Sequence, residues 1–351
     1  MSRFFSSKYS ELEAYTPGEQ PQGMEYIKLN TNESPFGPVR KAVEYAAAEA
    51  GKVHLYCDPE CEQLHRKMAE YYGVGRYQVL ATNGSDEILN FAFMAFCDEK
   101  TPVIFPDITY GFYQVFAQVN RLPYRQIPLR EDLSVDIRDY MGNDSTIILA
   151  NPNANTGIYL PLDDIEKILQ ANPDHVVVID EAYVDFGAQS AVQLVDRYEN
   201  LLVTQTFSKS WSMAGARLGV GIGQEALMND LNTIKYSTNP YNINRMTQGA
   251  GIGVLESTGE IRSNCAVICE NRAWTVSALQ KLGFTMTDSM ANFVFVRHPK
   301  ISGGDLYQEL KDRGILVRHF GNERISDYIR ITIGSMEQME ALVSTITEIL
   351  G

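Results

Sequence analysis

Short apolar runs alternate with longer segments of helical character between residues 77 and 222, and this rhythm limits the fold more than any other feature of the chain. A run that is apolar on both faces and is followed by a helix is typical of a strand in a parallel sheet with helices on both sides. The sequence therefore predicts an α/β fold with a mostly parallel central sheet. The expected strands lie in YQVLATN, TPVIFP, STIILANPN, HVVVIDEAY and LLVTQTFS.

The pattern changes after about residue 240. A long helix-like stretch from Met246 to Leu282 precedes FTMTDSMANFVFVRH, GILVRHF and YIRITIG, and together these segments favour a smaller α+β unit. The first 35 residues are rich in proline and glycine and predict an extended arm. We therefore predict an N-terminal arm over 1–35, a large domain over 36–240 and a small C-terminal domain over 241–351.

The charge of the chain bears on its partners. The formal net charge is −14, which disfavours binding to nucleic acid and to anionic membrane surfaces, because both are polyanions. The N-terminus has no signal-peptide core, and no stretch approaches the ~20 apolar residues that span a bilayer. We expect a cytoplasmic protein in which any anionic ligand is bound by local arginines.

The five cysteines, an odd number, favour a reducing compartment over a disulfide framework. The pairs Cys57/Cys61 and Cys265/Cys269 have spacings that could place two thiols on one helical face, as in a zinc site. His65 is the only further ligand nearby, however, and the chain has no paired CxxC motif. We therefore predict incidental cysteines and no metal.

Polar residues follow the predicted strands at the points where the strands end. They are Asn83 to Asp86, Asn151 to Asn153, Asp180-Glu181 and Ser208-Lys209. Because ligands bind beyond the carboxyl ends of parallel strands, we expect these residues to form one site.

The segment TFSKSWSMAGARLG places Lys209 at the end of a predicted strand and Arg217 eight residues later. A lysine amine forms Schiff bases with aldehydes when burial or neighbouring cations lower its pKa. Ser208 and Arg217 are groups that hold a phosphate ester, and Gly219 lets the backbone approach closely. The phosphorylated aldehyde that fits is pyridoxal 5'-phosphate (PLP). For Lys209 taken alone, a solvated surface charge is the alternative.

Three more residues suit a planar pyridine ring. Asp180 ends a predicted strand, where a carboxylate can pair with a protonated pyridine nitrogen or can cap a helix. Tyr183 can direct its phenol to the ring hydroxyl or can be a surface tyrosine. Tyr110 can stack on the ring or can simply pack against its neighbours.

The segment NGSDE at 83–87 leads from a predicted strand into a helix-like run. Free amide groups and the positive end of the helix dipole bind phosphate at such a position. This segment is therefore a candidate phosphate site, whereas simple capping by Ser85 or Asp86 is the alternative.

Taken in order along the chain, these segments resemble the fold-type I PLP-dependent enzymes, and among them the histidinol-phosphate aminotransferase family. The resemblance extends over nearly the whole chain. The matching motifs are YTPGEQPQ (15–22), KLNTNESPFGP (28–38), NGSDE (83–87), NPNANTG (151–157), VVIDEAYVDF (177–186), FSKSWSMAGARLG (207–219), GILVR (314–318) and YIRITIG (328–334).

The resemblance implies a role for each cofactor residue. Lys209 binds PLP covalently and moves the proton between the substrate and the cofactor, while Asp180 and Tyr183 bind the pyridine nitrogen and the ring hydroxyl. The remaining cofactor contacts fall to Tyr110 at the ring face and to Gly84, Ser85, Ser208 and Arg217 at the phosphate.

The same resemblance implies a homodimer, in which Tyr56 reaches the PLP phosphate of the partner subunit. It also assigns the substrate pocket to Tyr15, Asn32, Arg318 and Arg330. For the two arginines taken alone, surface ion pairs are the alternative.

The chain departs from the family pattern in two segments. Where the family has NPNNPTG, this chain has Ala154 and Asn155 in place of the asparagine that binds the ring oxygen and the proline after it. We choose Asn153 for the ring oxygen, with Asn155 as the alternative. Cys57 replaces a common proline next to Tyr56.

The resemblance implies transfer of an amino group between L-histidinol phosphate and 2-oxoglutarate in histidine biosynthesis. Two arginines suit this reaction, because guanidinium groups bind both a phosphate monoester and a dicarboxylate. Alternatives with the same fold are a transaminase for aromatic or other amino acids and a threonine-phosphate decarboxylase. A PLP-binding regulator without turnover is a more distant alternative, since such proteins usually add a DNA-binding segment or lose catalytic groups, and neither is seen here.

Overall fold

The computed structural model describes residues 2–10, 12–20 and 25–351. Its centre is a seven-stranded sheet with the strand order β2-β8-β7-β6-β5-β3-β4. Five neighbouring strands, from β7 to β4, run parallel to one another, and β8 is antiparallel to both of its neighbours. The strands are β2 (Val79–Thr82), β3 (Val103–Pro106), β4 (Tyr124–Ile127), β5 (Thr146–Ala150), β6 (Val177–Asp180), β7 (Leu201–Thr206) and β8 (Gly219–Gly223).

The sheet confirms the predicted α/β class, and each of the five predicted strands is present, as β2, β3, β5, β6 and β7. β4 and β8 were not predicted. β8 has the sequence GVGIG, in which the glycines weaken the apolar signal of a strand. At Gly219 a Cβ atom would lie 2.4 Å from the backbone of Gly84 and of Ser85, so the glycine is required by close packing rather than by a turn.

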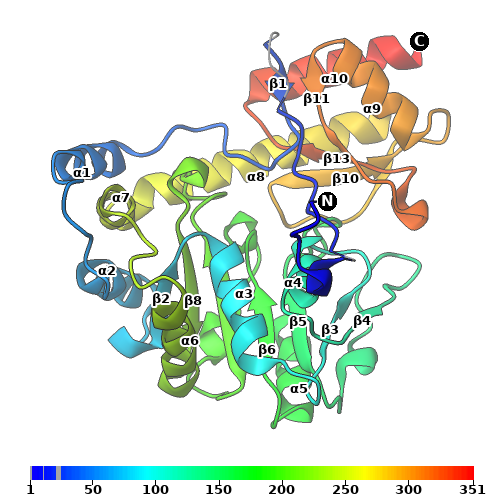
Figure 1. The fold of residues 1–351 in the computed structure, drawn as a ribbon. Helices are drawn as coiled ribbons and strands as arrows, with labels where there is room; N and C mark the ends of the chain where they lie inside the picture. The colour runs from blue at the N-terminus through cyan, green and yellow to red at the C-terminus, as the bar shows by residue number, and fades with distance from the viewer. Residues whose placement is uncertain (1, 11, 21–24) are drawn as a thin grey trace.

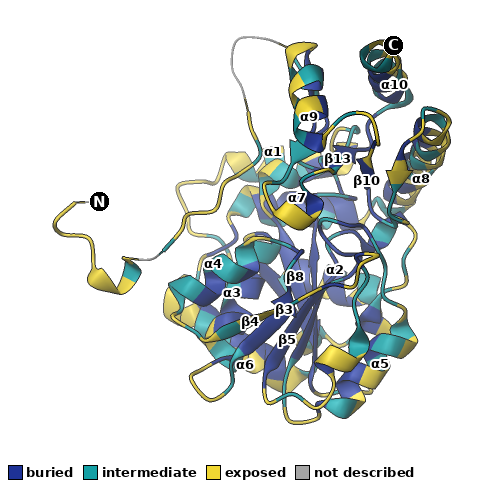
Figure 2. Ribbon diagram, turned by 90° about the vertical axis from the view of Figure 1, so that its right-hand side faces the viewer, coloured by how far each residue is buried: buried dark blue, intermediate teal, exposed yellow. Residues whose placement is uncertain are grey.

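Helices cover both faces of this sheet, as expected for buried parallel strands (Figure 1). On β6, Val178 faces one core cluster, whereas Val177 and Ile179 face the other. The first cluster contains residues of α3 (Ser85–Phe96), α4 (Phe112–Val119) and α6 (Glu225–Thr238). The second contains residues of α2 (Glu62–Tyr72), α5 (Leu162–Ala171) and α8 (Thr258–Lys281). The central strands are accordingly buried, while the outer faces of the helices are exposed (Figure 2).

A second, antiparallel sheet lies in the C-terminal part of the chain, with the order β12-β13-β10-β9. Its strands are β9 (Thr285–Met286), β10 (Phe293–Arg297), β12 (Arg318–His319) and β13 (Ile329–Thr332). α9 (Gly303–Asp312) and α10 (Met336–Leu350) complete this part, and α8 extends from near α7 to contact α10 and β10 (Figure 1). This arrangement agrees with the α+β unit predicted for the C-terminal part.

The N-terminal segment contacts both parts of the molecule, because Tyr15 packs on Phe112 of α4 and residues 27–28 pair with the C-terminal part. Within it, β1 (Ile27–Lys28) pairs in parallel with β11 (Ile315–Leu316), so the segment is tied to the C-terminal part by backbone hydrogen bonds. The predicted arm over 1–35 includes residues 1, 11 and 21–24, which lie outside the described residues.

The stretch predicted as helix-like from Met246 to Leu282 is two helices, α7 (Arg245–Leu255) and α8. The break falls at Glu256-Ser257, just before Thr258 and Gly259, and serine, threonine and glycine all have low helix propensity. α7 packs on α1 (Arg40–Ala50) and on α2. The proposed boundary between residues 240 and 241 stays a prediction. No helix of the described residues has the length and apolar character needed to cross a membrane.

Candidate active site

A cavity opens at the carboxyl ends of the central strands, where the sequence predicted a site. We call it the inner cavity. It is lined by Ser85, Asp86, Tyr110, Ala150, Pro152, Ala154, Asp180, Ala182, Tyr183, Thr206, Ser208, Lys209 and Arg217. Seven residues predicted to bind the cofactor are among them, although they are spread over more than 130 positions of the chain.

Lys209 lies in the turn that follows β7, with its side chain at the wall of the inner cavity. Its Nζ donates a hydrogen bond of 2.9 Å to the carbonyl oxygen of Thr31. Burial, followed by the positive charge of Arg330, lowers the pKa of Lys209 to about 8. A lysine with this pKa is partly unprotonated near neutral pH, which is the condition for attack on an aldehyde.

Asp180 is the last residue of β6 and is buried. Tyr113, from α4, donates a hydrogen bond of 2.7 Å to its Oδ2, and Thr204 donates one of 3.3 Å to its Oδ1. Burial raises the pKa of Asp180 to about 6, while these two hydrogen bonds act in the opposite direction. The sequence analysis missed Tyr113, because a tyrosine inside an apolar helix reads as a packing residue.

The start of α3 and the turn around Arg217 form a polar cup at one end of the inner cavity. Gly84 has a φ of +75°, and a Cβ atom there would lie 2.3 Å from Nη2 of Arg217. Arg217 also donates 3.3 Å to the hydroxyl of Ser208 and pairs with Asp86 at 3.1 Å. A helix N-terminus, a hydroxyl and a guanidinium together provide donors for a phosphate group. Thr206, missed by the sequence analysis, donates to Ser208 at 3.0 Å.

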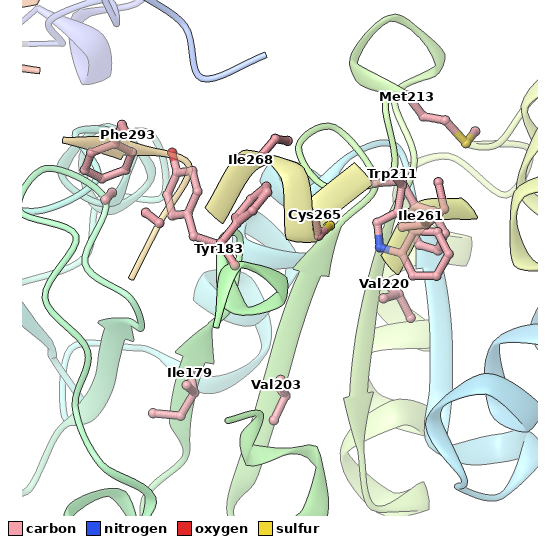
Figure 3. Close-up of a cluster of buried hydrophobic side chains, with 14 of the residues drawn as sticks. Ile179, Tyr183, Val203, Trp211, Met213, Val220, Ile261, Cys265, Ile268 and Phe293 are labelled. Atoms are coloured by element: carbon pink, nitrogen blue, oxygen red, sulfur yellow. The ribbon is translucent and has the colours of Figure 1, made fainter. Parts of the chain in front are cut away.

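Two tyrosines flank the inner cavity. The hydroxyl of Tyr110 donates 2.7 Å to Asp86, which fixes the ring at the cavity wall. Tyr183 is buried and accepts a hydrogen bond of 2.9 Å from the amide of Asn32. Its ring packs edge-on against Phe293, with the ring centres 5.2 Å apart (Figure 3). Burial raises the pKa of Tyr183, so its hydroxyl is protonated and can donate a hydrogen bond.

A second cavity, which we call the outer cavity, adjoins the first and shares Tyr110, Ala154, Tyr183 and Lys209 with it. Its other lining residues come mainly from the N-terminal segment and the C-terminal part. They are Tyr15, Pro17, Gly18, Asn30, Thr31, Asn32, Thr109, Gly111, Asn155, Arg318, Phe320 and Arg330. All four residues predicted to bind substrate are in this set.

The two arginines of the outer cavity are held by backbone carbonyl groups and by aromatic rings. Arg330 donates 2.9 Å to Ala154 and 3.4 Å to Asn30, and Arg318 donates to the carbonyls of Thr16 and Pro17. Both guanidinium groups lie over the ring of Phe320, at 5.4 and 5.6 Å. Within the part of the chain that the structure describes, neither arginine has a carboxylate within 4.0 Å. Two positive charges without a counter-ion favour binding of an anion.

Tyr15 and Asn32 also line the outer cavity. The ring of Tyr15 packs on Phe112 with centres 4.1 Å apart, next to Tyr110. Asn32 is buried, with a φ of 55°, and its backbone N–H donates 2.9 Å to the hydroxyl of Thr332.

Three of the residues considered for cofactor binding do not line the inner cavity of their own chain, and for one of them, Tyr56, the predicted site is that of the partner subunit. Tyr56 is 79% exposed, stacks on Tyr241 at 4.5 Å and lines neither cavity. The amide of Asn153 donates 2.9 Å to the carbonyl of Ile108, and this residue also lines neither cavity. Asn155 lines the outer cavity, but its amide donates to Thr109.

The cysteines form no site with other residues in the described ranges. All five are free thiols, and no group of three or more His, Cys, Asp or Glu side chains among residues 2–10, 12–20 and 25–351 is arranged to hold a metal ion.

The inner cavity fits PLP in its charges and donors. The polar cup suits the phosphate, the buried Asp180 suits the pyridine nitrogen, and Lys209 suits the aldehyde. The absence of side chains at Gly84 and Gly219 keeps the backbone of the cup close to Arg217 and to Ser85. The fold and this site define a PLP-dependent enzyme of fold type I.

The comparisons with known proteins agree with this class. The family model described as aminotransferase class I and II matches residues 24–346, and the chain belongs to this family. The chain is 46% identical to a histidinol-phosphate aminotransferase of Brachyspira hyodysenteriae and 45% identical to one of Acetobacter pasteurianus, covering 100% of this chain and 99% of each relative.

Solved structures share the fold. A histidinol-phosphate aminotransferase from Clostridium acetobutylicum superposes with a TM-score of 0.84 at 23% identity, over 92% of this chain and 99% of that one. The enzyme of the same name from Sinorhizobium meliloti, solved in complex with PLP, gives a TM-score of 0.83 at 22% identity, over 93% and 91% of the two chains.

Proposed function

We propose that this protein transfers an amino group between L-histidinol phosphate and 2-oxoglutarate, giving 3-(imidazol-4-yl)-2-oxopropyl phosphate and L-glutamate in histidine biosynthesis. The observation that carries the proposal is the full-length identity of up to 46% to histidinol-phosphate aminotransferases. The outer cavity supports it, because two arginines without carboxylate partners among the described residues lie beside Lys209.

The residues of the inner cavity would hold PLP by its three polar ends. Gly84, Ser85, Ser208 and Arg217 would bind the phosphate, and Asp180 would bind the pyridine nitrogen. When bound, PLP supplies an electron sink for the negative charge that develops on the substrate α-carbon. Tyr183 would donate to the ring oxygen, with its hydroxyl oriented by the amide of Asn32. Asn153 stays our proposal for a second donor, and this requires its amide to leave the carbonyl of Ile108.

Lys209 would act as the base and then as the acid. Its Nζ, free as an amine, would take the proton from the substrate α-carbon and return a proton on the cofactor side. A pKa of about 8 suits this exchange near neutral pH. Tyr110 would hold the cofactor ring in place by stacking on its face.

Arg330 and Arg318 would bind the anionic end of each substrate. A guanidinium group donates two parallel hydrogen bonds to a phosphate or to a carboxylate, so one pocket can accept both substrates in turn. Tyr15 and Asn32 would close the pocket on the side of the N-terminal segment.

We further propose that the protein acts as a homodimer in which Tyr56 reaches the PLP phosphate of the partner subunit. The exposure of Tyr56 supports this, because the side chain stacks on Tyr241 and is otherwise largely open to contact from a second subunit. Exposed apolar side chains also lie on α1, on α7, which packs against α1, and in their flanking loops, and exposed apolar groups favour an interface. They are Val43, Val53, Leu55, Tyr241 and Met246.

Mixed dimers test the shared site. Tyr56→Ala and Lys209→Ala are each expected to have low activity as separate proteins. In a heterodimer of the two, one site has both Lys209 and the tyrosine of the other subunit, so mixing after mild dissociation is expected to restore activity. A monomer in sedimentation, or mixing without any recovery, would contradict the shared site.

We also propose a cytoplasmic location. The five free thiols support it, since a reducing compartment keeps thiols unpaired.

Half-reactions on the purified holoenzyme test the substrate. L-Histidinol phosphate, L-glutamate, L-phenylalanine and O-phospho-L-threonine are added separately, and the absorbance of the lysine-bound cofactor is followed, with carbon dioxide release measured for phosphothreonine. We expect histidinol phosphate and glutamate to convert the cofactor at far lower concentrations than the other two. Preference for phenylalanine, or carbon dioxide release from phosphothreonine, would overturn the substrate while leaving the fold and the cofactor in place.

A further inference from the structure

Tyr113 is a buried tyrosine whose hydroxyl meets the most buried carboxylate of the inner cavity. Its exposed fraction is 0%, and its hydroxyl donates 2.7 Å to Oδ2 of Asp180. The ring packs edge-on against Tyr110, with centres 5.7 Å apart at 87°, and against Phe105. Tyr113 does not line the inner cavity, so it cannot touch a ligand there directly.

Burial raises the pKa of Asp180 and so favours its neutral form. A carboxyl group in a low-dielectric site favours the protonated form, and hydrogen bonds to the carboxylate oppose this preference. Such donors come from Tyr113 on α4, from Thr204 on β7 and from the backbone N–H of Ala182.

The charged groups around Asp180 do not stabilise its ionised form. The negative charge of Asp86, on α3, raises the pKa of Asp180 further. Tyr110 and Tyr183 are protonated phenols, because burial raises the pKa of each. The cations in the same cavity are Lys209 and Arg217, and Arg217 is already paired with Asp86 at 3.1 Å. Of the hydrogen bonds from side chains to Asp180, the one from Tyr113 is the shortest.

We propose that Tyr113 is a positioning residue that keeps Asp180 ionised and fixes the carboxylate toward the pyridine nitrogen of the cofactor. Tyr113 binds Oδ2 and Thr204 binds Oδ1, so the carboxylate cannot rotate freely at the wall of the inner cavity. The proposal rests on the proposed use of PLP, but not on which amino acid is the substrate.

A simpler interpretation is that Tyr113 only fills space in the core between α4 and the sheet. Phenylalanine would fill the same space equally well, since the two residues differ only by the hydroxyl. The protein also contains a matched case: Tyr140 is 1% exposed, and its hydroxyl has no hydrogen-bond partner among the described residues. Removal of the hydroxyl at each position therefore separates packing from the contact with the carboxylate.

The experiment measures the dissociation constant for PLP as a function of pH for the wild type and for Tyr113→Phe, Thr204→Val and Tyr140→Phe. Apoprotein is titrated with PLP, and binding is followed by absorbance and by fluorescence, so that turnover is not needed. Melting temperatures establish that each variant is folded. The ionisations of PLP and of Lys209 are common to all four proteins and cancel in the ratio of variant to wild-type dissociation constants.

We expect Tyr113→Phe to raise the pKa of Asp180, because the variant loses a donor to the carboxylate. The ratio of dissociation constants is then smallest near pH 9 and increases as the pH falls toward about 6, reaching roughly 10- to 100-fold. Thr204→Val is expected to give the same trend with a smaller amplitude, since its hydrogen bond is longer, at 3.3 Å. Tyr140→Phe is expected to leave the ratio near one at every pH.

The outcomes separate this inference from the proposed function. A wild-type protein that binds no PLP would overturn the proposed function and this inference together. PLP binding by the wild type, with a ratio for Tyr113→Phe that is independent of pH, would overturn the inference alone and would leave Tyr113 as a packing residue.

Discussion

The inner and outer cavities are neighbours, yet the protein builds them in different ways. The inner cavity is formed by residues of the large sheet and its connecting turns, between Ser85 and Arg217, and its polar groups are linked by side-chain hydrogen bonds such as that from Tyr113 to Asp180. The outer cavity joins segments about 300 residues apart, as in the hydrogen bond between Asn32 and Thr332. We therefore expect cofactor binding to depend mainly on the large sheet and its turns, whereas substrate binding depends on docking of the N-terminal segment and the C-terminal part.

This difference has an energetic consequence. Asp180, Tyr183 and Ser208 of the inner cavity are buried, so loss of a hydrogen-bond partner there leaves an unpaired polar group at low dielectric, which is costly. The outer cavity is more exposed at its rim, where water can replace lost contacts. Substitutions should therefore have larger effects in the inner cavity than at the edge of the outer one.

The largest expected effect is that of Lys209→Ala. Without an amine at this position, no group is in place to bind the aldehyde or to move the α-proton, and we expect kcat to fall on the order of 10⁴-fold or more. Steady-state kinetics with histidinol phosphate, together with absorbance of the bound cofactor, measures this.

The matched control for this variant is Lys235→Met. Lys235 is 1% exposed and donates to the carbonyl of Pro59, so it is a buried lysine outside both cavities. Its loss is expected to lower stability with little change in kcat per folded enzyme. Equal loss of kcat in the two variants would show that burial of a lysine, rather than its place in the inner cavity, determines the effect.

The next largest effect is expected on stability, at His65. This residue does not line the inner cavity but accepts a hydrogen bond from a strand that leads to it. Its Nε2 accepts a hydrogen bond of 2.8 Å from the backbone N–H of Ala81, on the edge strand β2 that leads to Gly84. Burial lowers the pKa of His65 from its ordinary 6.5 to about 3. The unfolded chain therefore binds more protons than the folded one between these pH values, so this contribution to stability is present above pH 6.5 and is lost as the pH falls toward about 3.

Chemical unfolding across this pH range measures the effect. The His65 contribution to the free energy of unfolding is expected to decrease on the order of 3–5 kcal/mol over the window. His65→Gln keeps an acceptor but does not titrate, so its unfolding free energy should depend less on pH. His54→Gln, at an exposed position, serves as the control. The same pH dependence in wild type and in His65→Gln would be incompatible with this assignment.

The contrast between the cavities also explains what the sequence could reveal. Asp180 and Lys209 each lie in a contiguous motif at the end of a predicted strand. Because the carboxyl ends of parallel strands lie at one edge of the sheet, the sequence alone places these two residues together. Tyr113 was missed because its partner, Asp180, is 67 residues away and nothing local marks the contact. β4 and β8 were missed because β4 is polar on its exposed positions and β8 is rich in glycine.

Asn153 and Tyr56 mark the limits of motif reasoning. The motif places Asn153 next to the site, but the direction of its amide depends on the carbonyl of Ile108, which belongs to another loop. The exposed position of Tyr56 requires a second subunit for its proposed role, and the sequence of one chain does not contain that geometry. The roles of both residues stay predictions.

A smaller effect is expected in the outer cavity, where Arg330→Lys and Arg318→Lys can be compared directly. Lysine keeps the charge but loses the paired donors, so we expect the KM for 2-oxoglutarate to rise roughly 10- to 100-fold for Arg330→Lys. Arg318 lies nearer the rim and is held by carbonyls of the N-terminal segment, so a rise of no more than about 5-fold is expected. In both variants kcat should change less than KM, which full kinetics for both substrates would reveal. A larger rise in KM for Arg318→Lys than for Arg330→Lys would show that Arg318, and not Arg330, is the more important residue for substrate binding.

The smallest effect is expected where the N-terminal segment contacts α9, next to the outer cavity. Glu19 pairs with Lys311 at 2.5 Å and accepts from the hydroxyl of Tyr307 at 2.6 Å, while its carbonyl accepts from Asn30. The ion pair is exposed to solvent, so Glu19→Gln should weaken docking of this segment by no more than about 1 kcal/mol. The two residues before it, Pro17 and Gly18, line the outer cavity, and therefore KM should rise by less than about 5-fold, with a smaller difference at high salt.

Kinetics of Glu19→Gln, Lys311→Gln and the double variant, at low and high salt, would isolate the contribution of the Glu19–Lys311 ion pair. An effect on PLP affinity would contradict the separation of the two cavities, because the contacts of Glu19 reach only the outer one.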